Sequence, residues 1–324
     1  MTKSLTILRT AAGSPPSVSQ YQHFQRLGHR VVAGDCAPLS VGFVFADAAY
    51  VLPRADAPEY VDRLLEICSE EHVDVFLPAL DEELLLVAEH LDRFAAVGTQ
   101  ALVSSSETLH LCVDKLRTFE AFREHGIPTI PTVLASDAAT VTTFPAVVKP
   151  RRGRGSAGVH IARNAGELTF FAGYVRDAVV QPFIAGTEFT VDVLADRASK
   201  LRIVSPRKRL ATDSGISSKG ITAWHDDLVR HVAQIVERLR IVGPANIQCF
   251  LTDDGRLLFS EINARLAGTC ILSVAAGVPL FEGICSLATG DEITDCLHPV
   301  EPKILMRYWS EAYVGPEQVI ARTP

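Results

Sequence analysis

The sequence predicts an α/β protein whose first lobe is built on a parallel sheet with helices on its faces. Three observations lead to this fold class. Strand-like and helix-like segments alternate over the first 110 residues, and strands and glycines dominate from Phe144 to Asp196. The chain has 324 residues, which is more than one small domain needs and enough for two or three lobes that share an interface.

The composition excludes several classes of protein. The net charge of −7 argues against a general nucleic-acid binder, which needs an excess of Lys and Arg. No apolar run reaches the roughly 18 residues of a membrane span, and the apolar stretch near the N-terminus is too short for a secretory signal. The seven cysteines include no Cys-x-x-Cys pair, as is typical of reduced thiols. We therefore expect a soluble cytoplasmic enzyme or binding protein without nucleic-acid or membrane partners.

The first lobe follows a βαβ order. Its expected strands lie at 5–10, 29–35, 48–53 and 73–80, and its expected helices at 17–28 and 59–72. In parallel sheets, ligands gather at the carboxyl ends of the strands. Gly13, Asp35 and the run Asp81-Glu82-Glu83 fall at such ends. No Gly-x-Gly-x-x-Gly follows the first strand, so Gly13 is a weak candidate for nucleotide binding.

Two further units follow the first lobe. An amphipathic helix at 114–126 ends at Gly126, and the run Ile-Pro-Thr-Ile-Pro begins a new unit. Later segments are a strand at 201–209, a polar loop at 211–220, a helix at 225–239 and a hairpin at 244–265. We place the boundaries near residues 113 and 186. The expected lobes are 1–113, 114–185 and 186–324.

A glycine-rich loop at 144–159 is a candidate phosphate site. A short apolar strand delivers Lys149, and the loop behind it contains Gly153, Gly155 and Gly158. Glycines let backbone N–H groups turn toward an anion, Lys149 supplies a positive charge, and Ser156 supplies a hydroxyl donor. The alternative is a flexible hairpin tip that carries a basic patch. This patch would contain Arg151, Arg152 and Arg154.

A second candidate site lies on the hairpin around Asp254-Gly255, a strong turn signal. If this turn has two residues and the strands have no bulge, Gln248 lies opposite Glu261 and Asn246 opposite Asn263. Strand alternation then places Gln248, Glu261 and Asn263 on one face. The other face would be buried and would contain Ile247, Cys249, Leu251, Leu258 and Ile262. Amide and carboxylate oxygens suit Mg²⁺, although a solvated polar face is the alternative.

In chain order, these motifs resemble the ATP-grasp superfamily, specifically its carbamoyl-phosphate-synthase-like carboxylate–amine ligases. The motifs are Asp-Lys before a helix, Phe-Pro-x-Val-x-Lys-Pro, Gly-x-Gly-Ser-x-Gly-Val, a hinge and Glu-x-Asn-x-Arg. The resemblance implies the ATP-grasp fold, with a Rossmann-like N-terminal lobe followed by two α+β lobes that clamp ATP. The second lobe would be the lid, and the third would carry the metal hairpin.

The resemblance implies a role for each matching residue. Lys115 and Lys149 would contact the nucleotide phosphates beneath the lid formed by Gly153, Gly155, Ser156 and Gly158. The hinge at Gln181, Pro182, Phe183 and Ile184 would bind adenine through its backbone, and Glu188 would bind the ribose hydroxyls. Gln248, Glu261 and Asn263 would hold one or two Mg²⁺ ions. Arg265 would stabilise the transferred phosphoryl group.

The implied activity is an ATP-dependent, ADP-forming ligation of a small carboxylate, such as an amino acid, to an amine through an acyl phosphate. The alternatives are a phosphotransferase or carbamoyl-phosphate-type enzyme, and a non-catalytic ATP-binding sensor subunit. The family analogy also suggests a homodimer.

Several residues have two interpretations. Arg207 and Arg209 share one strand face and could hold the substrate carboxylate or the acyl phosphate, or form a solvated basic edge. The polar loop at 211–220 could cover the substrate or be an ordinary surface loop. Glu82 could select the amine or interact with a helix dipole. His225 is expected to start a helix rather than act as a base.

Overall fold

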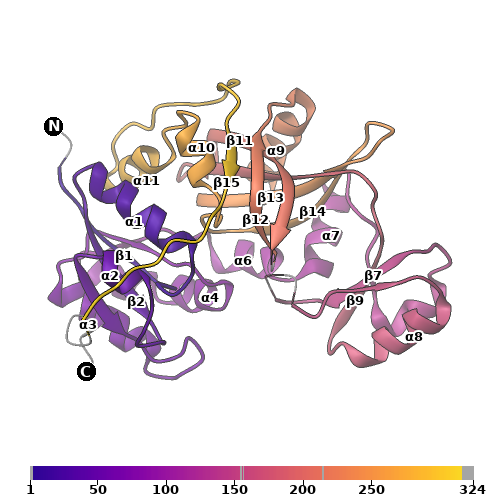
Figure 1. Cartoon of the computed structure of the whole chain (residues 1–324), viewed down its shortest axis with the longest axis horizontal. Coiled ribbons are helices and arrows are strands. Elements are labelled where there is room, and N and C mark those ends of the chain that lie inside the picture. The colour runs from indigo at the N-terminus through magenta and orange to yellow at the C-terminus, as the bar shows by residue number, and fades with distance from the viewer. Residues whose placement is uncertain (1–2, 154, 156, 214, 316–324) are drawn as a thin grey trace.

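The computed structural model describes residues 3–153, 155, 157–213 and 215–315. Within these residues the strands form a five-stranded, a four-stranded and a six-stranded sheet, one for each lobe (Figure 1). None of the helices in this part of the chain combines the length and the apolar character that crossing a bilayer requires.

The first lobe has a parallel sheet in the order β3-β2-β1-β4-β5, which confirms the predicted fold class. Its strands are β1 (Thr6–Arg9), β2 (Arg30–Asp35), β3 (Ala48–Val51), β4 (Val75–Leu77) and β5 (Gln100–Ala101). Its helices are α1 (Pro16–Arg26), α2 (Gly42–Phe45), α3 (Tyr60–Glu70), α4 (Asp81–Glu89), α5 (Leu91–Ala96) and α6 (Ser106–Cys112). Helix α4 begins at Asp81, directly after β4, so its first residues lie at the carboxyl edge of the sheet.

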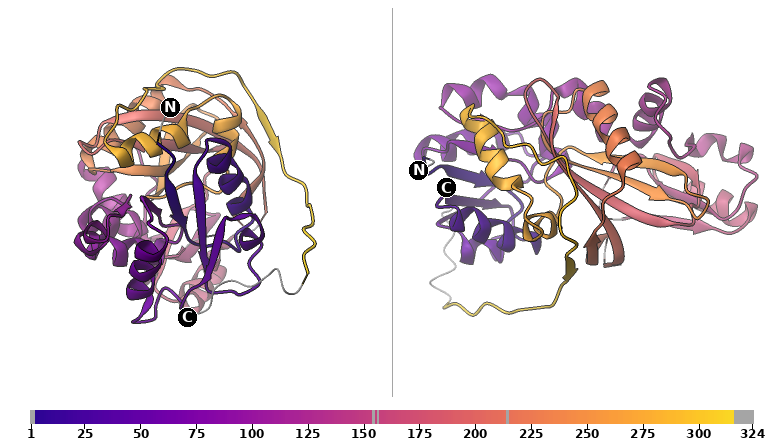
Figure 2. Two further views of the ribbon diagram at one scale, coloured as in Figure 1. Left: turned by 90° about the vertical axis from the view of Figure 1, so that its left-hand side faces the viewer. Right: turned by 90° about the horizontal axis from the view of Figure 1, so that it is seen from above.

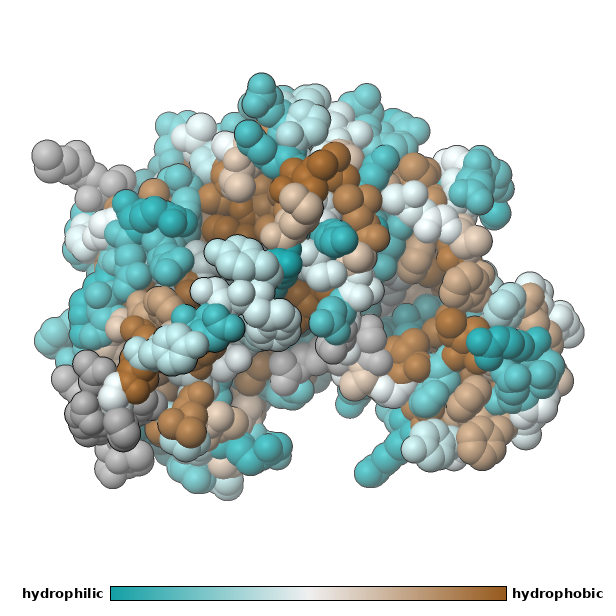
Figure 3. Space-filling model, viewed as in Figure 1, coloured by the Kyte–Doolittle hydropathy of each residue, from teal (hydrophilic) through white to brown (hydrophobic). Residues whose placement is uncertain are grey.

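The lid lobe is small and protrudes from the rest of the molecule, and the outline beside it is hollowed (Figure 3). Helix α7 (Lys115–Glu124) leads into it. The lobe contains β6 (Val133–Leu134), the 3₁₀ helix η1 (Ala135–Thr140), β7 (Ala146–Pro150), β8 (His160–Ala162), α8 (Ala165–Tyr174) and β9 (Ala178–Pro182). The sheet order is β6-β9-β7-β8, and every pair is antiparallel.

The third lobe is an antiparallel sheet in the order β14-β13-β10-β11-β12-β15. Its strands are β10 (Thr187–Ala195), β11 (Leu201–Asp213), β12 (Ile216–Thr222), β13 (Gly243–Leu251), β14 (Leu257–Asn263) and β15 (Ile304–Met306). Its helices are α9 (Asp226–Arg238), α10 (Ile271–Ala275) and α11 (Leu280–Thr289). After β15 the chain turns back in the direction of the first lobe and stands apart from its helices (Figures 1 and 2).

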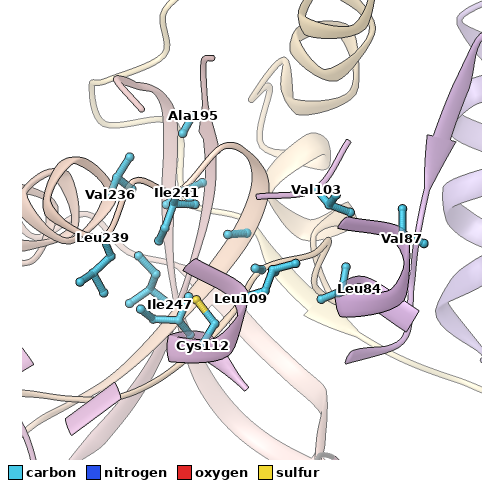
Figure 4. Close-up of a cluster of buried hydrophobic side chains, with 14 of the residues drawn as sticks. Leu84, Val87, Val103, Leu109, Cys112, Ala195, Val236, Leu239, Ile241 and Ile247 are labelled. Carbon is cyan, nitrogen blue, oxygen red and sulfur yellow. The ribbon is translucent and has the colours of Figure 1, made fainter. Parts of the chain in front are cut away.

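The hydrophobic cores divide the molecule differently from the sheets. Two cores are shared by the first and third lobes, so that Leu84 and Leu109 belong to the same cluster as Val236 and Ile247 (Figure 4). Phe122 of α7 joins this cluster, although the predicted boundary at residue 114 placed α7 with the lid. The lid has its own core of seven buried residues. Because packed interiors resist deformation, the shared cores join the first and third lobes into one body, whereas the lid packs on a core of its own.

Candidate active site

The predicted pairing at the far end of the β13–β14 hairpin is present. Gln248 pairs with Glu261, and Asn246 pairs with Asn263. The assumptions behind this register were wrong, however. The turn is one residue longer, since the Thr252 N–H donates to the Arg256 carbonyl at 2.9 Å, and a bulge beside Gln248 restores the register. The longer turn and the bulge each shift the pairing by one residue, and the two shifts cancel. Gln248 and Glu261 therefore still pair as predicted.

The bulge reverses the faces of β14 near the turn. Phe259 is fully buried in the shared core, whereas Leu258, which we expected on the buried face, is only half-buried. Beyond the bulge, Glu261 and Asn263 are half-buried and Ile262 is buried, as predicted. The Asn263 Nδ2 donates to Asn246 Oδ1 at 3.2 Å and to Glu261 Oε1 at 3.4 Å. These contacts fix an oxygen-rich patch rather than a freely solvated face.

Arg209 lies inside this patch and does not form a solvated basic edge. Its Nη1 donates to Glu188 and, at 3.4 Å, to Gln248 Oε1. Strand β10 lies between β11 and β13, which brings residues of three strands together. Burial raises the pKa of Glu188, and the Arg209 charge opposes that rise. Glu188 therefore sits beside the predicted metal ligand Gln248.

The two lysines of the predicted phosphate site approach the same patch. Burial lowers the pKa of Lys149, while the charge of Glu261 acts to raise it. Within the described residues, the Lys149 ammonium donates no hydrogen bond. Lys115 donates from Nζ to the Gly153 carbonyl at 2.9 Å. A half-buried ammonium that donates to none of the described residues and lies near the Glu261 carboxylate is suited to bind phosphate oxygens.

The lid loop is anchored on the start of α7. Asp114 caps that helix and accepts a hydrogen bond from Arg151 Nε at 2.8 Å. The Lys115 N–H donates to the Arg151 carbonyl at 3.0 Å. Arg151 is thus part of a built loop rather than of a free basic patch. Ser156, a predicted phosphate donor, and Arg154 lie outside the described residues.

Residues 211–220, predicted as a polar loop, mostly continue strands β11 and β12 as a hairpin, because Ala211 pairs with Lys219 and Thr212 with Ser217. The hairpin tip reaches the lid. A Cβ built on Gly215 would lie 2.7 Å from the carbonyl carbon of Gly155. Arg209 Nη2 donates to the Gly215 carbonyl at 2.8 Å. The tip therefore touches the lid loop on one side and the oxygen-rich patch on the other.

Arg265 is paired with the first lobe. Its Nε donates to Asp81 Oδ1 at 2.7 Å, and its Nη2 donates to Asp81 Oδ2 at 3.2 Å. The two side chains are 16% and 21% exposed, so the pair is only partly screened by solvent. The sequence pattern predicted that Asp81 lies at a strand end, but it did not predict which residue Asp81 would contact. Its position directly after a buried parallel strand was the available signal.

Arg207 does not contribute to the site, which corrects the expectation that it holds a substrate carboxylate. Its side chain is 2% exposed. Its Nε and Nη2 donate to both oxygens of Asp192 at 2.7 Å, and its Nη1 donates to Thr269. A guanidinium with these partners is a buried structural ion pair.

Of the predicted hinge residues, Gln181 and Pro182 end strand β9, and Phe183 and Ile184 lie between β9 and β10. The Gln181 side chain is buried and donates to Thr132 Oγ1 at 2.8 Å. The Phe183 N–H donates to the Pro145 carbonyl at 2.9 Å. Among the described residues, the Ile184 N–H donates to no carbonyl, and adenine binding by these residues stays a prediction. Pro182 ends β9 and has no N–H.

A cavity of about 160 Å³ lies where the lobes meet. It is lined by Asp81, Glu82, Leu84, Leu85, Cys112, Val113, Lys115, Arg152, Gly153, Glu261, Ile262, Asn263 and Ala264. Glu82 faces this cavity, and its part in selecting an amine stays a prediction.

His225 accepts a hydrogen bond from the Leu228 N–H at 3.3 Å, which confirms that it starts helix α9.

The residues of the patch fit Mg²⁺ in chemical type. Glu261 offers a carboxylate, and Gln248 and Asn263 offer amide oxygens. Mg²⁺ usually binds one or two carboxylates together with waters and substrate phosphates. No group of three or more His, Cys, Asp or Glu side chains that could hold a metal occurs among the described residues.

Two family profiles match the chain. One, described as a PylC-like N-terminal domain, matches residues 7–102, and one described as an ATP-grasp domain matches residues 112–269. A carbamoyl-phosphate synthase of Methanobrevibacter smithii is 23% identical over 83% of this chain and 76% of its own length. The carbamoyl phosphate synthase large chain of Xylella fastidiosa is 27% identical over 83% of this chain, which spans 27% of that protein. The N5-carboxyaminoimidazole synthetase of Staphylococcus aureus, solved with ADP, has a TM-score of 0.76 at 17% identity, over 95% of this chain and 83% of that chain.

Proposed function

We propose that this chain, whose residues 112–269 match the ATP-grasp domain, joins a small carboxylic acid to an amine, with ADP and phosphate as co-products. One observation carries the proposal. Three segments, namely α7, β7 and the end of β14, bring charged and amide side chains together beneath the glycine lid. These side chains are Lys115, Lys149, Glu261, Asn263 and Arg265. This set neutralises phosphates and leaves room for a second reactant.

The first proposed step is phosphoryl transfer. A carboxylate oxygen of the acid attacks the γ-phosphorus of ATP, the bond to the β-phosphate oxygen breaks, and ADP leaves. Such a transition state spreads negative charge over the phosphoryl oxygens, so positioned cations are the main source of catalysis. Lys149, Lys115 and Arg265 supply these cations. Mg²⁺, held by Gln248, Glu261 and Asn263, would add further positive charge beside the phosphates.

The second proposed step is acyl transfer. The amine attacks the acyl carbon, inorganic phosphate leaves with the carbon–oxygen bond electrons, and the amine loses a proton. An acyl phosphate is hydrolysed by water unless water is excluded. The contact between Gly155 of the lid and Gly215 of the β11–β12 hairpin closes the site over the reacting groups.

A matrix of carboxylic acids and amines, incubated with Mg²⁺-ATP and assayed for phosphate and ADP, tests the proposal. We expect ADP formation that depends on one class of acid, and an acyl hydroxamate when hydroxylamine replaces the amine. Glu261→Ala should abolish this turnover. Asp253→Ala should leave it unchanged, because Asp253 is exposed at the tip of the same hairpin. Formation of AMP and pyrophosphate would exclude the mechanism.

The similarity to carbamoyl-phosphate synthases favours a second candidate, in which the acyl phosphate is itself the product. Release of a stable phosphorylated product without any amine would support this candidate. ATP binding with no turnover for any acid would support a sensor subunit instead. A cytoplasmic location and a homodimer stay predictions.

A further inference from the structure

The cavity at the meeting point of the lobes has one charged end. Asp81, Glu261 and Asn263 line it, and Asp81 is the residue that holds Arg265. Lys115 and Gly153 bring the lid loop to the same end. On the proposed mechanism, this end receives the γ-phosphate and the carboxylate that attacks it.

Glu82 and Arg152 also line the cavity, and the rest of the wall is apolar. Six of the thirteen lining residues are apolar: Leu84, Leu85, Cys112, Val113, Ile262 and Ala264. Leu85 and Val113 are half-buried, so their side chains are the accessible part of this wall. Behind them, Leu84 and Cys112 are buried in the core shared by the first and third lobes (Figure 4). The wall is therefore fixed in position and does not depend on lid closure.

The cavity is also small. Its volume of about 160 Å³ is well below the roughly 300 Å³ at which pockets for drug-sized ligands begin. An apolar wall in the same cavity as the phosphate-binding groups stabilises a methylene or methyl group of the substrate. It leaves a polar substituent of the substrate without a hydrogen-bond partner. The first and third lobes supply the apolar part of the wall, whereas on the proposed function the nucleotide would lie between the third lobe and the lid.

We propose that this cavity binds the organic part of the acid substrate and restricts it to small acids with an aliphatic chain, which packs against Leu85 and Val113. The proposal rests on the proposed ligase function and identifies the substrate class of the same site. The carboxylate lies at the charged end, beside Arg265. The aliphatic chain points toward the junction of α6 and α7.

The test compares acids of increasing chain length, with and without an α-amino group, in the wild type and in Leu85→Ala and Val113→Ala. Each methylene that fills the added space should gain about fourfold in kcat/KM. We expect the preferred chain to lengthen in both variants while the KM for ATP is unchanged. Leu86→Ala is the matched control, because Leu86 is also a half-buried leucine of α4 but does not line the cavity.

Leu85→Met keeps the volume and guards against misfolding of the alanine variants, and it should retain the wild-type preference. Leu85→Asn places an amide in the wall and should lower kcat/KM for aliphatic acids at least tenfold. An unchanged order of acids in Leu85→Ala and Val113→Ala, with turnover intact, would overturn the cavity assignment and leave the ligase function standing. Absence of acid-dependent turnover in the wild type would instead refute the ligase function itself.

Discussion

Replacing Gly215 by alanine tests whether the β11–β12 hairpin and the lid close over the reacting groups. Gly215 has a φ of +77°, in the left-handed region that side chains disfavour. A Cβ at this position would lie 2.7 Å from the carbonyl carbon and 2.9 Å from the Cα of Gly155. Both atoms belong to the backbone of the lid loop and cannot rotate away as a side chain could.

The expected magnitude has two parts. The left-handed conformation costs alanine about 1–2 kcal/mol in open and closed states alike. The overlap with Gly155 exists only when the lid is closed, and overpacking of this kind costs about 1–3 kcal/mol. The second part shifts the closing equilibrium toward the open state by about 5- to 150-fold, since 1.4 kcal/mol corresponds to a factor of ten.

The assay measures ADP and ligated product in parallel. We expect Gly215→Ala to lower the yield of product per ADP, because an open lid admits water to the acyl phosphate. Gly98→Ala is the control, since Gly98 has a φ of +84° and no heavy atom within 4 Å of its Cβ position. Equal coupling of ADP to product in the two variants, after correction for stability, would refute the closing contact.

Three further outcomes are expected. Asp81→Asn should lower kcat by about 10- to 100-fold with little change in the KM for ATP, because a charge-assisted pair of about 1.5–3 kcal/mol no longer orients Arg265. Steady-state kinetics checks this outcome, and an unchanged kcat contradicts it. Burial lowers the pKa of Lys149, so its ammonium loses its charge at a pH below the ordinary lysine pKa of about 10.4. In a pH profile, kcat/KM for ATP should therefore begin to fall below that pH. Lys149→Arg should remove this fall. Burial raises the pKa of Glu83, so its contribution to stability is present below the unfolded value of about 4.3 and is lost as pH rises through the folded pKa. Urea unfolding of Glu83→Gln over pH 4–9 should lack that loss, and parallel curves for both proteins would exclude it.

The sequence predicted the parts of the site that depend on local patterns. Strand alternation placed Gln248, Glu261 and Asn263 on one face, and this held because the longer turn and the bulge offset each other. The same bulge reversed Leu258 and Phe259, since a one-residue shift moves a side chain to the opposite face. The longer turn and the bulge accompany the packing of Phe259 into the shared core, a long-range contact that no local pattern reveals.

Long-range partners were beyond prediction. Arg207 and Arg209 are the same residue type on the same face of β11. Arg207 is buried in contacts with Asp192 and Thr269. Arg209 is held in the site by Glu188 and Gln248. These partners lie on other strands and on the segment before α10. Likewise, Asp81 and Arg265 are separated by 184 residues and meet only through the packing of the first lobe on the third.

The separate core of the lid lobe has a consequence for cooperativity. Seven buried residues hold this lobe together, whereas the first and third lobes share two larger clusters. Cooperative unfolding units follow such divisions, so the lid is a unit of low local stability. Its backbone amides should exchange with solvent deuterium through an opening that leaves the body intact, and nucleotide binding should slow that exchange.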